Sequence, residues 1–169
     1  ASYIVVEHNE STPYDRLVSL ANKSSNREYW YKRKINDGTI DRFLLGNIEG
    51  WSTVPIYVDG LLYNVQIRRD DPAKEITKWY PGKFPVLFNS GILKFTESIV
   101  ITEGLTDCVL LNQEGIASVS HDGGSNYWNN TWVSKFIRQR EIYYIADNDD
   151  AGVLAATKVA KNLGEYRVK

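Results

Sequence analysis

The hydrophobic pattern is most regular in the C-terminal part of the chain, where apolar runs alternate with amphipathic stretches. Three apolar runs have the length of buried strands: residues 99–102, 116–119 and 142–146. Three amphipathic stretches have the length and period of helices: residues 105–113, 127–138 and 150–163. Residues 166–168 have the pattern of a fourth strand that is just beginning. Strands that alternate with helices indicate βαβ units and a parallel sheet, whose strands all end at one edge.

The N-terminal part of the chain begins with helical signals. Thr12 followed by Pro13 predicts a helix start, because a hydroxyl can cap the helix and proline suits its first position. Residues 26–34 predict a second helix. Thr39 is expected to cap a third, short helix that ends at Gly46.

A β-hairpin is predicted next along the chain. Two β-prone runs, residues 54–58 and 61–67, flank an Asp-Gly pair, which is the strongest short-range hairpin signal. Residues 70–84 are polar and contain proline and glycine, so they predict a loop. We therefore expect a smaller α+β subdomain over residues 1–95 and an α/β domain over residues 96–169.

Composition excludes several classes of protein. The 169 residues are 43% hydrophobic and 24% charged, as in an ordinary globular domain. No apolar run approaches the ~20 residues that span a bilayer, and residues 1–11 carry none of the features of a secretion signal. A cytoplasmic protein with no membrane partner is expected. The single cysteine, Cys108, excludes a disulfide within the chain and a cysteine-based zinc site.

Charge is divided unevenly along a chain whose net charge is only −1. Residues 68–94 are mainly basic, with six cations (Arg68, Arg69, Lys74, Lys78, Lys83, Lys94) and three acids (Asp70, Asp71, Glu75). Residues 103–150 are mainly acidic, with eight acids (Glu103, Asp107, Glu114, Asp122, Glu141, Asp147, Asp149, Asp150) and three cations (Lys135, Arg138, Arg140). This division suits a nucleic-acid groove facing a metal site, and it equally suits two halves that pair through their surfaces.

Three acids fall where the predicted parallel strands end. Glu103 follows the first strand, and Asp147 and Asp149 follow the third. Strand ends share one edge of such a sheet, where ligands bind. Mg²⁺ prefers carboxylate oxygens and would relieve the repulsion among them. In an extended segment, Asp147 and Asp149 would point the same way.

A structural explanation of the same residues stays open. Asp150 could cap the helix that begins at Ala151, and the acidic run would then be only a capped turn. A calcium-binding EF-hand does not fit, because Ala151 and Lys158 stand where that loop needs acidic ligands.

Three segments together resemble the Toprim domain, the metal-binding module shared by topoisomerases, DnaG-like primases and some nucleases. They are Ile-Thr-Glu-Gly-Leu-Thr-Asp (101–107), Gly-Ile-Ala-Ser-Val-Ser (115–120) and Ile-Ala-Asp-Asn-Asp-Asp-Ala-Gly (145–152). The match covers about the last seventy residues. The resemblance implies that Glu103, Asp147 and Asp149 form the metal centre and act in catalysis. It also implies supporting positions: Asp107, which matches an aspartate of the primase branch, Asp150, Gly104 and Gly152.

The upstream half resembles DnaG-like primases in the same order. The similar segments are residues 31–46, the hairpin, Arg68-Arg69, residues 78–80 and residues 85–89. The resemblance implies that Arg68 or Arg69, together with Lys78, lines the groove for template and nucleotide. Ser90 stands where those primases carry a basic residue, so part of the phosphate clamp differs.

The last acidic motif of the family should follow the fourth strand, but the sequence ends at Lys169. We therefore expect a Toprim domain truncated at its C-terminus and a fragment of a larger phage or plasmid replication protein. The expected fold class is α/β, with a Toprim-type parallel sheet flanked by helices, preceded by a smaller α+β subdomain with a β-hairpin.

The resemblance implies a DNA primase-type nucleotidyltransferase that depends on Mg²⁺ or Mn²⁺. Such an enzyme makes short primers on single-stranded DNA from nucleoside triphosphates, with a replicative helicase as a fused or separate partner. Two alternatives stay open: a Toprim nuclease whose acids activate water, and a catalytically inactive nucleic-acid-binding fragment.

Several aromatic residues and one histidine could serve either function or structure. Tyr29, Trp30 and Tyr31 lie among basic residues and could stack on bases, or could be half core and half surface. Trp128 and Trp132 share one helical face and are expected in the core. His121 is expected to be a loop residue rather than a metal ligand, because no second histidine is near it.

Overall fold

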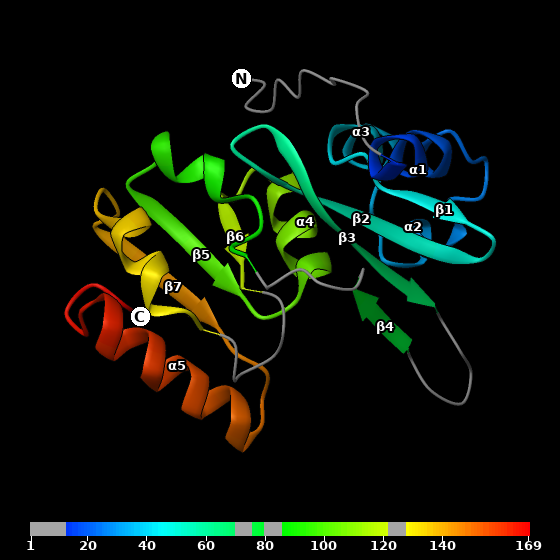
Figure 1. The fold of residues 1–169 in the computed structure, drawn as a ribbon. Coiled ribbons are helices and arrows are strands. Elements are labelled where there is room, and N and C mark those ends of the chain that lie inside the picture. Colours follow the sequence, from blue (N-terminus) through cyan, green and yellow to red (C-terminus); the bar gives the residue numbers. More distant parts are fainter. Residues whose placement is uncertain (1–12, 70–75, 80–85, 122–127) are drawn as a thin grey trace. The chain divides into compact units, whose positions relative to one another are not determined.

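The chain divides into two compact units in a computed structural model that describes residues 13–69, 76–79, 86–121 and 128–169. The first unit is Ala1–Phe84 and the second is Pro85–Lys169 (Figure 1). This division falls earlier than the expected boundary at residue 95. Phe88 pairs with Ser120, and Leu87 and Leu93 enter the core of the second unit, so this segment belongs there.

The first unit begins with the three expected helices. They are α1 (Pro13–Asn22), α2 (Glu28–Lys32) and α3 (Asp37–Arg42). The prediction that Thr39 caps α3 is wrong. Asn36 is the cap, because its side-chain oxygen accepts a hydrogen bond from the backbone N–H of Thr39 at 2.9 Å. The Asn-Asp-Gly sequence at residues 36–38 is typical of a turn. An asparagine side chain, however, can also cap a helix, as that of Asn36 does here.

An antiparallel sheet follows these helices, with strand order β1-β2-β3-β4. Its strands are β1 (Gly46–Ile48), β2 (Trp51–Val58), β3 (Leu61–Arg69) and β4 (Ile76–Trp79). The predicted hairpin is confirmed. Asp59 and Gly60 have φ values of +50° and +82°, as a tight hairpin turn requires.

One part of the expected loop over residues 70–84 is a strand. Ile76–Trp79 forms β4 and pairs with the edge of β3, so the loop prediction is wrong there. The remaining residues of that segment lie outside the described part of the chain. A four-residue strand between polar flanks has too little pattern to be recognised.

Helix α1 packs closely on β1 in the core of the first unit. A Cβ atom at Gly46 would lie 2.3 Å from the backbone carbon of Ala21, so only glycine permits this approach. The indole N–H of Trp30 donates to the Gly46 carbonyl at 3.1 Å. Tyr29 and Trp30 are buried while Tyr31 is 52% exposed, which confirms that this aromatic cluster is half core and half surface.

The second unit contains the predicted parallel sheet, with strand order β6-β5-β7. Its strands are β5 (Ser98–Thr102), β6 (Ser118–Ser120) and β7 (Glu141–Ile145). The α-helices are α4 (Leu105–Gln113) and α5 (Asp150–Leu163), with the predicted bounds. The α/β fold class, with a parallel sheet preceded in the chain by an antiparallel sheet that contains the hairpin, is confirmed (Figure 1).

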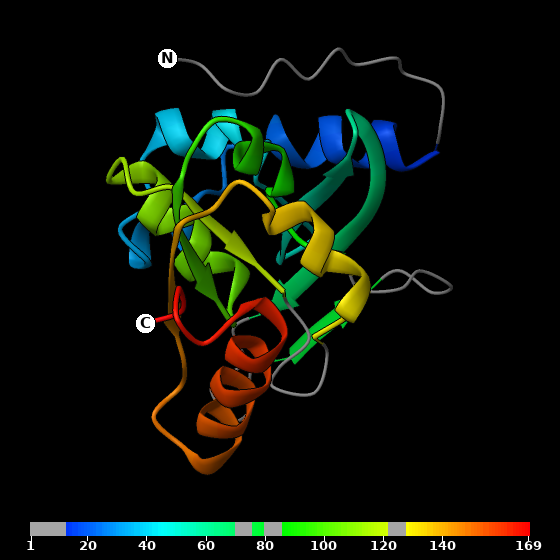
Figure 2. The ribbon, with the colours of Figure 1, turned by 90° about the vertical axis from the view of Figure 1, so that its left-hand side faces the viewer.

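Two short 3₁₀ helices complete this unit, η1 (Ser90–Lys94) and η2 (Asn130–Phe136). The second replaces most of the α-helix predicted over residues 127–138, of which residue 127 is not described. Asn129 caps η2 by accepting from the N–H of Thr131 at 2.9 Å. Asn, Thr and Val have low α-helix propensity, which disfavours a longer α-helix here. Figure 2 shows η2 beside α5, with which it packs.

The fourth strand expected at residues 166–168 is present as a single parallel bridge from Val168 to Ile142. The Ile142 N–H donates to the Arg167 carbonyl, and the Lys169 N–H donates to the Ile142 carbonyl, both at 2.8 Å. These bonds cover part of the outer edge of β7.

No helix among the described residues has the length and apolar character to cross a membrane.

The core of the second unit lies between the sheet and the helices. Its fully buried side chains include Ile99 and Ile101 from β5 and Ile142 from β7. Trp128 and Trp132 are each 5% exposed, with ring centroids 5.6 Å apart, which confirms their place in the core.

Candidate metal centre

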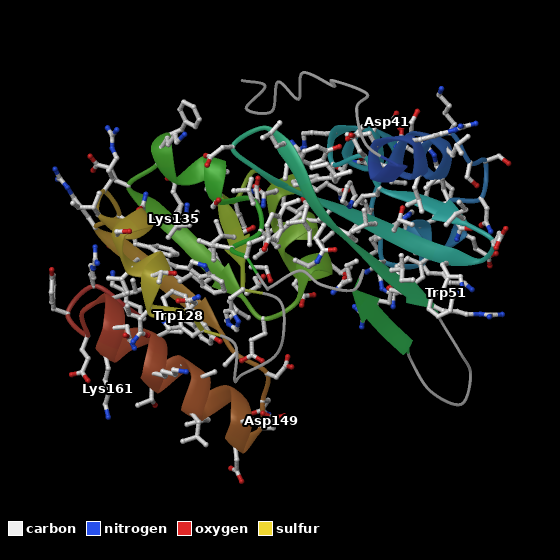
Figure 3. The ribbon with its side chains drawn as sticks, viewed as in Figure 1. Asp41, Trp51, Trp128, Lys135, Asp149 and Lys161 are labelled. Carbon is white, nitrogen blue, oxygen red and sulfur yellow. The ribbon has the colours of Figure 1, made fainter. Side chains whose placement is uncertain are left out.

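Two neighbouring strand ends bring the predicted acids to one edge of the parallel sheet. The register pairs Thr102, the last residue of β5, with Ile145, the last residue of β7. Glu103 follows the first directly, and Asp147 lies two residues beyond the second. More than forty sequence positions therefore separate residues that the parallel arrangement places together. Figure 3 labels Asp149 at the start of α5, beside this edge.

The Glu103 carboxylate is half-buried and lies within electrostatic reach of both aspartates. Its burial and the Asp147 carboxylate raise its pKa, with a smaller contribution from Asp149. Hydrogen bonds from the Tyr144 hydroxyl, at 3.3 Å, and from the Asp147 backbone oppose that shift. Like charges this close repel one another, and a bound cation would relieve that repulsion.

Asp149 has a structural role as well as its predicted one. It is the N-cap of α5, because its Oδ1 accepts from the Gly152 N–H at 2.7 Å. The proposed cap at Asp150 is therefore wrong; Asp150 is the first residue of the helix. The Asp149 N–H donates to the Asp147 carbonyl at 2.9 Å, so the segment is a tight turn, and the same-side placement that an extended segment would give does not apply. The strand ends at Ile145 and the helix begins five residues later, which leaves room only for a turn.

Two glycines permit close approach at this edge. A Cβ atom at Gly152 would lie 2.2 Å from the Asp147 carbonyl oxygen, so glycine lets the start of α5 rest on the acidic turn. A Cβ atom at Gly104 would lie 2.7 Å from Oδ2 of Asp107. Asp107 therefore folds over the N-terminus of α4 and is exposed there. Gly104, Gly152 and Asp107 thus shape the edge. Their supporting role at a metal centre stays a prediction.

The three acids share the edge without converging on one point. Among the described residues, no three His, Cys, Asp or Glu side chains form a group that could hold a metal ion. The donor set nevertheless fits Mg²⁺ in its chemistry, because it offers carboxylate oxygens and Glu103 already interacts unfavourably with Asp147. Asp147 is exposed, so its side chain has room to turn toward Glu103, whereas Asp149 is also exposed but is held by its cap bond to Gly152. Metal coordination by Glu103, Asp147 and Asp149 stays a prediction.

The predicted phosphate-binding cations belong to the first unit. Arg68 and Arg69 are successive residues of β3 and therefore point to opposite faces of its sheet. Arg69 is exposed, with its guanidinium 5.8 Å from the Trp51 ring centroid, whereas Arg68 is half-buried. Lys78 takes the register position opposite Ile67, and its side chain lies outside the described part.

Sequence reasoning missed two residues behind the acids, Tyr144 and His121. His121 is fully buried and follows the end of β6, as Glu103 follows that of β5. Its Nε2 lies 2.6 Å from the Tyr144 hydroxyl, and the two rings stack with centroids 5.7 Å apart. A signal existed in the sequence: Tyr144 alternates with the apolar Ile142, and a tyrosine on an inward-facing strand position needs a partner for its hydroxyl.

Comparison with solved structures identifies the class of fold. The primase fragment of the bacteriophage T7 primase-helicase protein superimposes with a TM-score of 0.70, at 20% identity over 82% of this chain and 61% of that one. A DnaG primase catalytic domain bound to single-stranded DNA gives 0.70, at 18% identity over 88% of this chain and 66% of that one. The chain thus has the fold of the DnaG-type primase catalytic core, which confirms the resemblance at the level of fold. It spans less than two thirds of the length of each of these two chains.

No protein-family model matches the sequence. A curated relative does: the Gene 57 protein of Mycobacterium phage D29 is 30% identical over 105 residues, which are 62% of this chain and 68% of the relative. The chain belongs to the family of this phage protein.

Proposed function

We propose that the chain is part of a metal-dependent nucleotidyltransferase of the DNA primase type, which makes short primers on single-stranded DNA during replication. The observation that carries the proposal is the placement of Glu103 beside the Asp147–Asp149 turn at the strand-end edge of a primase-type fold. Three acids in that position match the chemistry of phosphoryl transfer, in which charge on phosphate oxygens must be neutralised.

Glu103, Asp147 and Asp149 would hold Mg²⁺ or Mn²⁺. The bound ion would supply charge stabilisation for the transferring phosphoryl group. The protein contributes position: the Tyr144 hydroxyl and the Asp147 N–H orient Glu103, and the α5 cap fixes Asp149. Positioning of this kind accounts for most of the catalysis in phosphoryl transfer, because little covalent chemistry falls to the protein.

The proposed partners are a single-stranded DNA template, nucleoside triphosphates and a replicative helicase. The similar DnaG domain was solved with single-stranded DNA, and the similar T7 fragment comes from a primase-helicase. The cations of the first unit, Arg69 foremost because it is exposed, would contact phosphates without reading sequence.

Metal binding is the first test. Mn²⁺ titrated into the protein and followed by electron paramagnetic resonance should bind, and an Asp147→Asn/Asp149→Asn double variant should lose that binding. An Asp41→Asn variant is a matched control, because Asp41 is exposed and belongs to the first unit. Equal Mn²⁺ binding by the double variant and the wild type would remove the site.

Activity is the second test. The protein, incubated with single-stranded template, nucleoside triphosphates and Mg²⁺, should yield short primers, and the double variant should yield none. Nicked template in place of primers would assign the same acids to a nuclease. Metal and DNA binding with neither product would leave a nucleic-acid-binding fragment.

A further inference from the structure

A line of hydrogen bonds leads from the Glu103 carboxylate into the interior of the second unit. The Tyr144 hydroxyl lies 3.3 Å from Oε1 of Glu103 and 2.6 Å from Nε2 of His121. The three residues come from three different strands or strand ends, β5, β7 and β6. A carboxylate at the surface is thereby joined to a histidine that is fully buried.

Packing fixes the two inner members of this line. The ring of His121 stacks on that of Tyr144 with an interplanar angle of 12°. The edge of the Trp128 ring meets His121 at a centroid distance of 6.1 Å and an angle of 86°. Trp128 in turn belongs to the core cluster of this unit. Neither ring can turn without disturbing that core, so the hydroxyl of Tyr144 is held in place.

The proton positions follow from the number of donors. A tyrosine hydroxyl has one proton, and an ionised Glu103 can only accept. Both contacts are satisfied only if Tyr144 donates to Glu103 while Nε2–H of His121 donates to Tyr144. The opposite tautomer of His121 would turn the Tyr144 proton inward and leave Glu103 without this donor. Burial lowers the pKa of His121, partly offset by its own backbone, which keeps the ring neutral near pH 7.

We propose that Tyr144, held by His121, is a positioning residue that fixes the rotamer of Glu103 and directs its second carboxylate oxygen outward to the metal. This inference rests on the proposed function, because it assigns a support to one of the proposed metal ligands. Hydrogen-bonded partners of metal ligands orient the ligand, and their loss commonly weakens metal affinity. Tyr144 would act on the ion only through Glu103.

The test compares two adjacent tyrosines of β7. Tyr144→Phe removes the hydroxyl and keeps the ring, whereas Tyr143→Phe changes a tyrosine that is 38% exposed and points to the other face of the strand. Mn²⁺ affinity measured by electron paramagnetic resonance should fall about tenfold for Tyr144→Phe and stay unchanged for Tyr143→Phe. Thermal unfolding of both variants should show that they are folded at the temperature of the titration.

A second measurement needs no metal and no variant. The ¹⁵N chemical shifts of the His121 ring in the wild-type protein report its tautomer, and the proposal expects the proton on Nε2. A proton on Nδ1 would overturn the arrangement, and so would wild-type Mn²⁺ affinity in Tyr144→Phe. A wild-type protein that binds no Mn²⁺ would instead overturn the proposed metal centre, and the role of Tyr144 with it.

Discussion

The two units place their chemistry by different geometric rules. In the second unit all strands run parallel, so the residues after β5, β6 and β7 gather at one edge however far apart they are in the sequence. In the first unit the chain reverses at each turn, and a residue's place depends on the face of its strand. Arg68 and Arg69 are neighbours in sequence and yet point apart. The direction of the strands is enough to predict where the acids lie. To predict where the cations lie, one must also know the pairing register of the strands and the face of the sheet to which each side chain points.

The edge of the second unit can be broken at one glycine. Gly152→Ala would place a Cβ atom 2.2 Å from the Asp147 carbonyl oxygen, so the turn or the helix must shift. We expect the free energy of unfolding to fall by about 3 kcal/mol, together with Mn²⁺ affinity. Urea denaturation and Mn²⁺ titration measure the two effects. Gly91→Ala is the matched control, since an added Cβ has no neighbour within 4 Å there, and an equal loss in both variants would contradict the explanation.

Alkaline pH should weaken both units, because burial raises the pKa of at least one group in each. Burial raises the pKa of Cys108 in the second unit to about 12, from 9.0. Between these values the unfolded chain loses the thiol proton while the folded one keeps it, so stability present below pH 9 declines as pH rises. At pH 10.5 the loss should reach about 1–2 kcal/mol, measured as the urea midpoint against that at pH 8.

Variants separate the contributions of the two units. Cys108→Ala should reduce the loss of unfolding free energy between pH 8 and pH 10.5 by about 1–2 kcal/mol. Tyr57→Phe is its counterpart in the first unit, because burial and the Asp15 carboxylate raise the pKa of Tyr57 to about 12. Parallel pH curves for wild type and Cys108→Ala would show that the thiol is not the cause.

The exposed face of β3, which carries Arg69, should make a small contribution to DNA binding. Arg69→Ala removes an exposed cation and should weaken single-stranded DNA binding a few-fold. It should also reduce the slope of log affinity against log salt by about 0.7, the value for one phosphate contact on a single strand. Arg16→Ala, which removes an exposed cation of α1, is the control. Fluorescence anisotropy at several salt concentrations gives both quantities; an unchanged slope for Arg69→Ala would exclude its phosphate contact.

Local signals predicted much of this fold. Asp59-Gly60 marked the hairpin, because turn residues act on their immediate neighbours, and the amphipathic pattern gave the bounds of α4 and α5 correctly. Strand β4 was missed because its four residues stand between polar flanks and show too short a pattern to be recognised. The predicted α-helix at residues 127–138 became a 3₁₀ helix around buried Trp132, where packing decides the geometry.

The candidate site was predictable in place and not in detail. Alternating strands and helices located Glu103 and Asp147 at one edge, since that follows from topology. The turn at Asp149 depends on which of two adjacent aspartates caps the helix, and either is chemically suitable. The alternation of Tyr144 with Ile142 shows that its hydroxyl needs a partner, but that the partner is His121 depends on the packing of separate strands.

The burial of Cys108 also determines how the protein can be labelled. Its thiol is the only one in the chain, is fully buried beside Ser118 and Asn112, and stays protonated at neutral pH. Maleimide dyes and nitroxide probes react with accessible thiolates, so the folded protein should not react with them. A cysteine introduced at the exposed Thr157 of α5 would therefore carry a single dye without removal of the natural thiol.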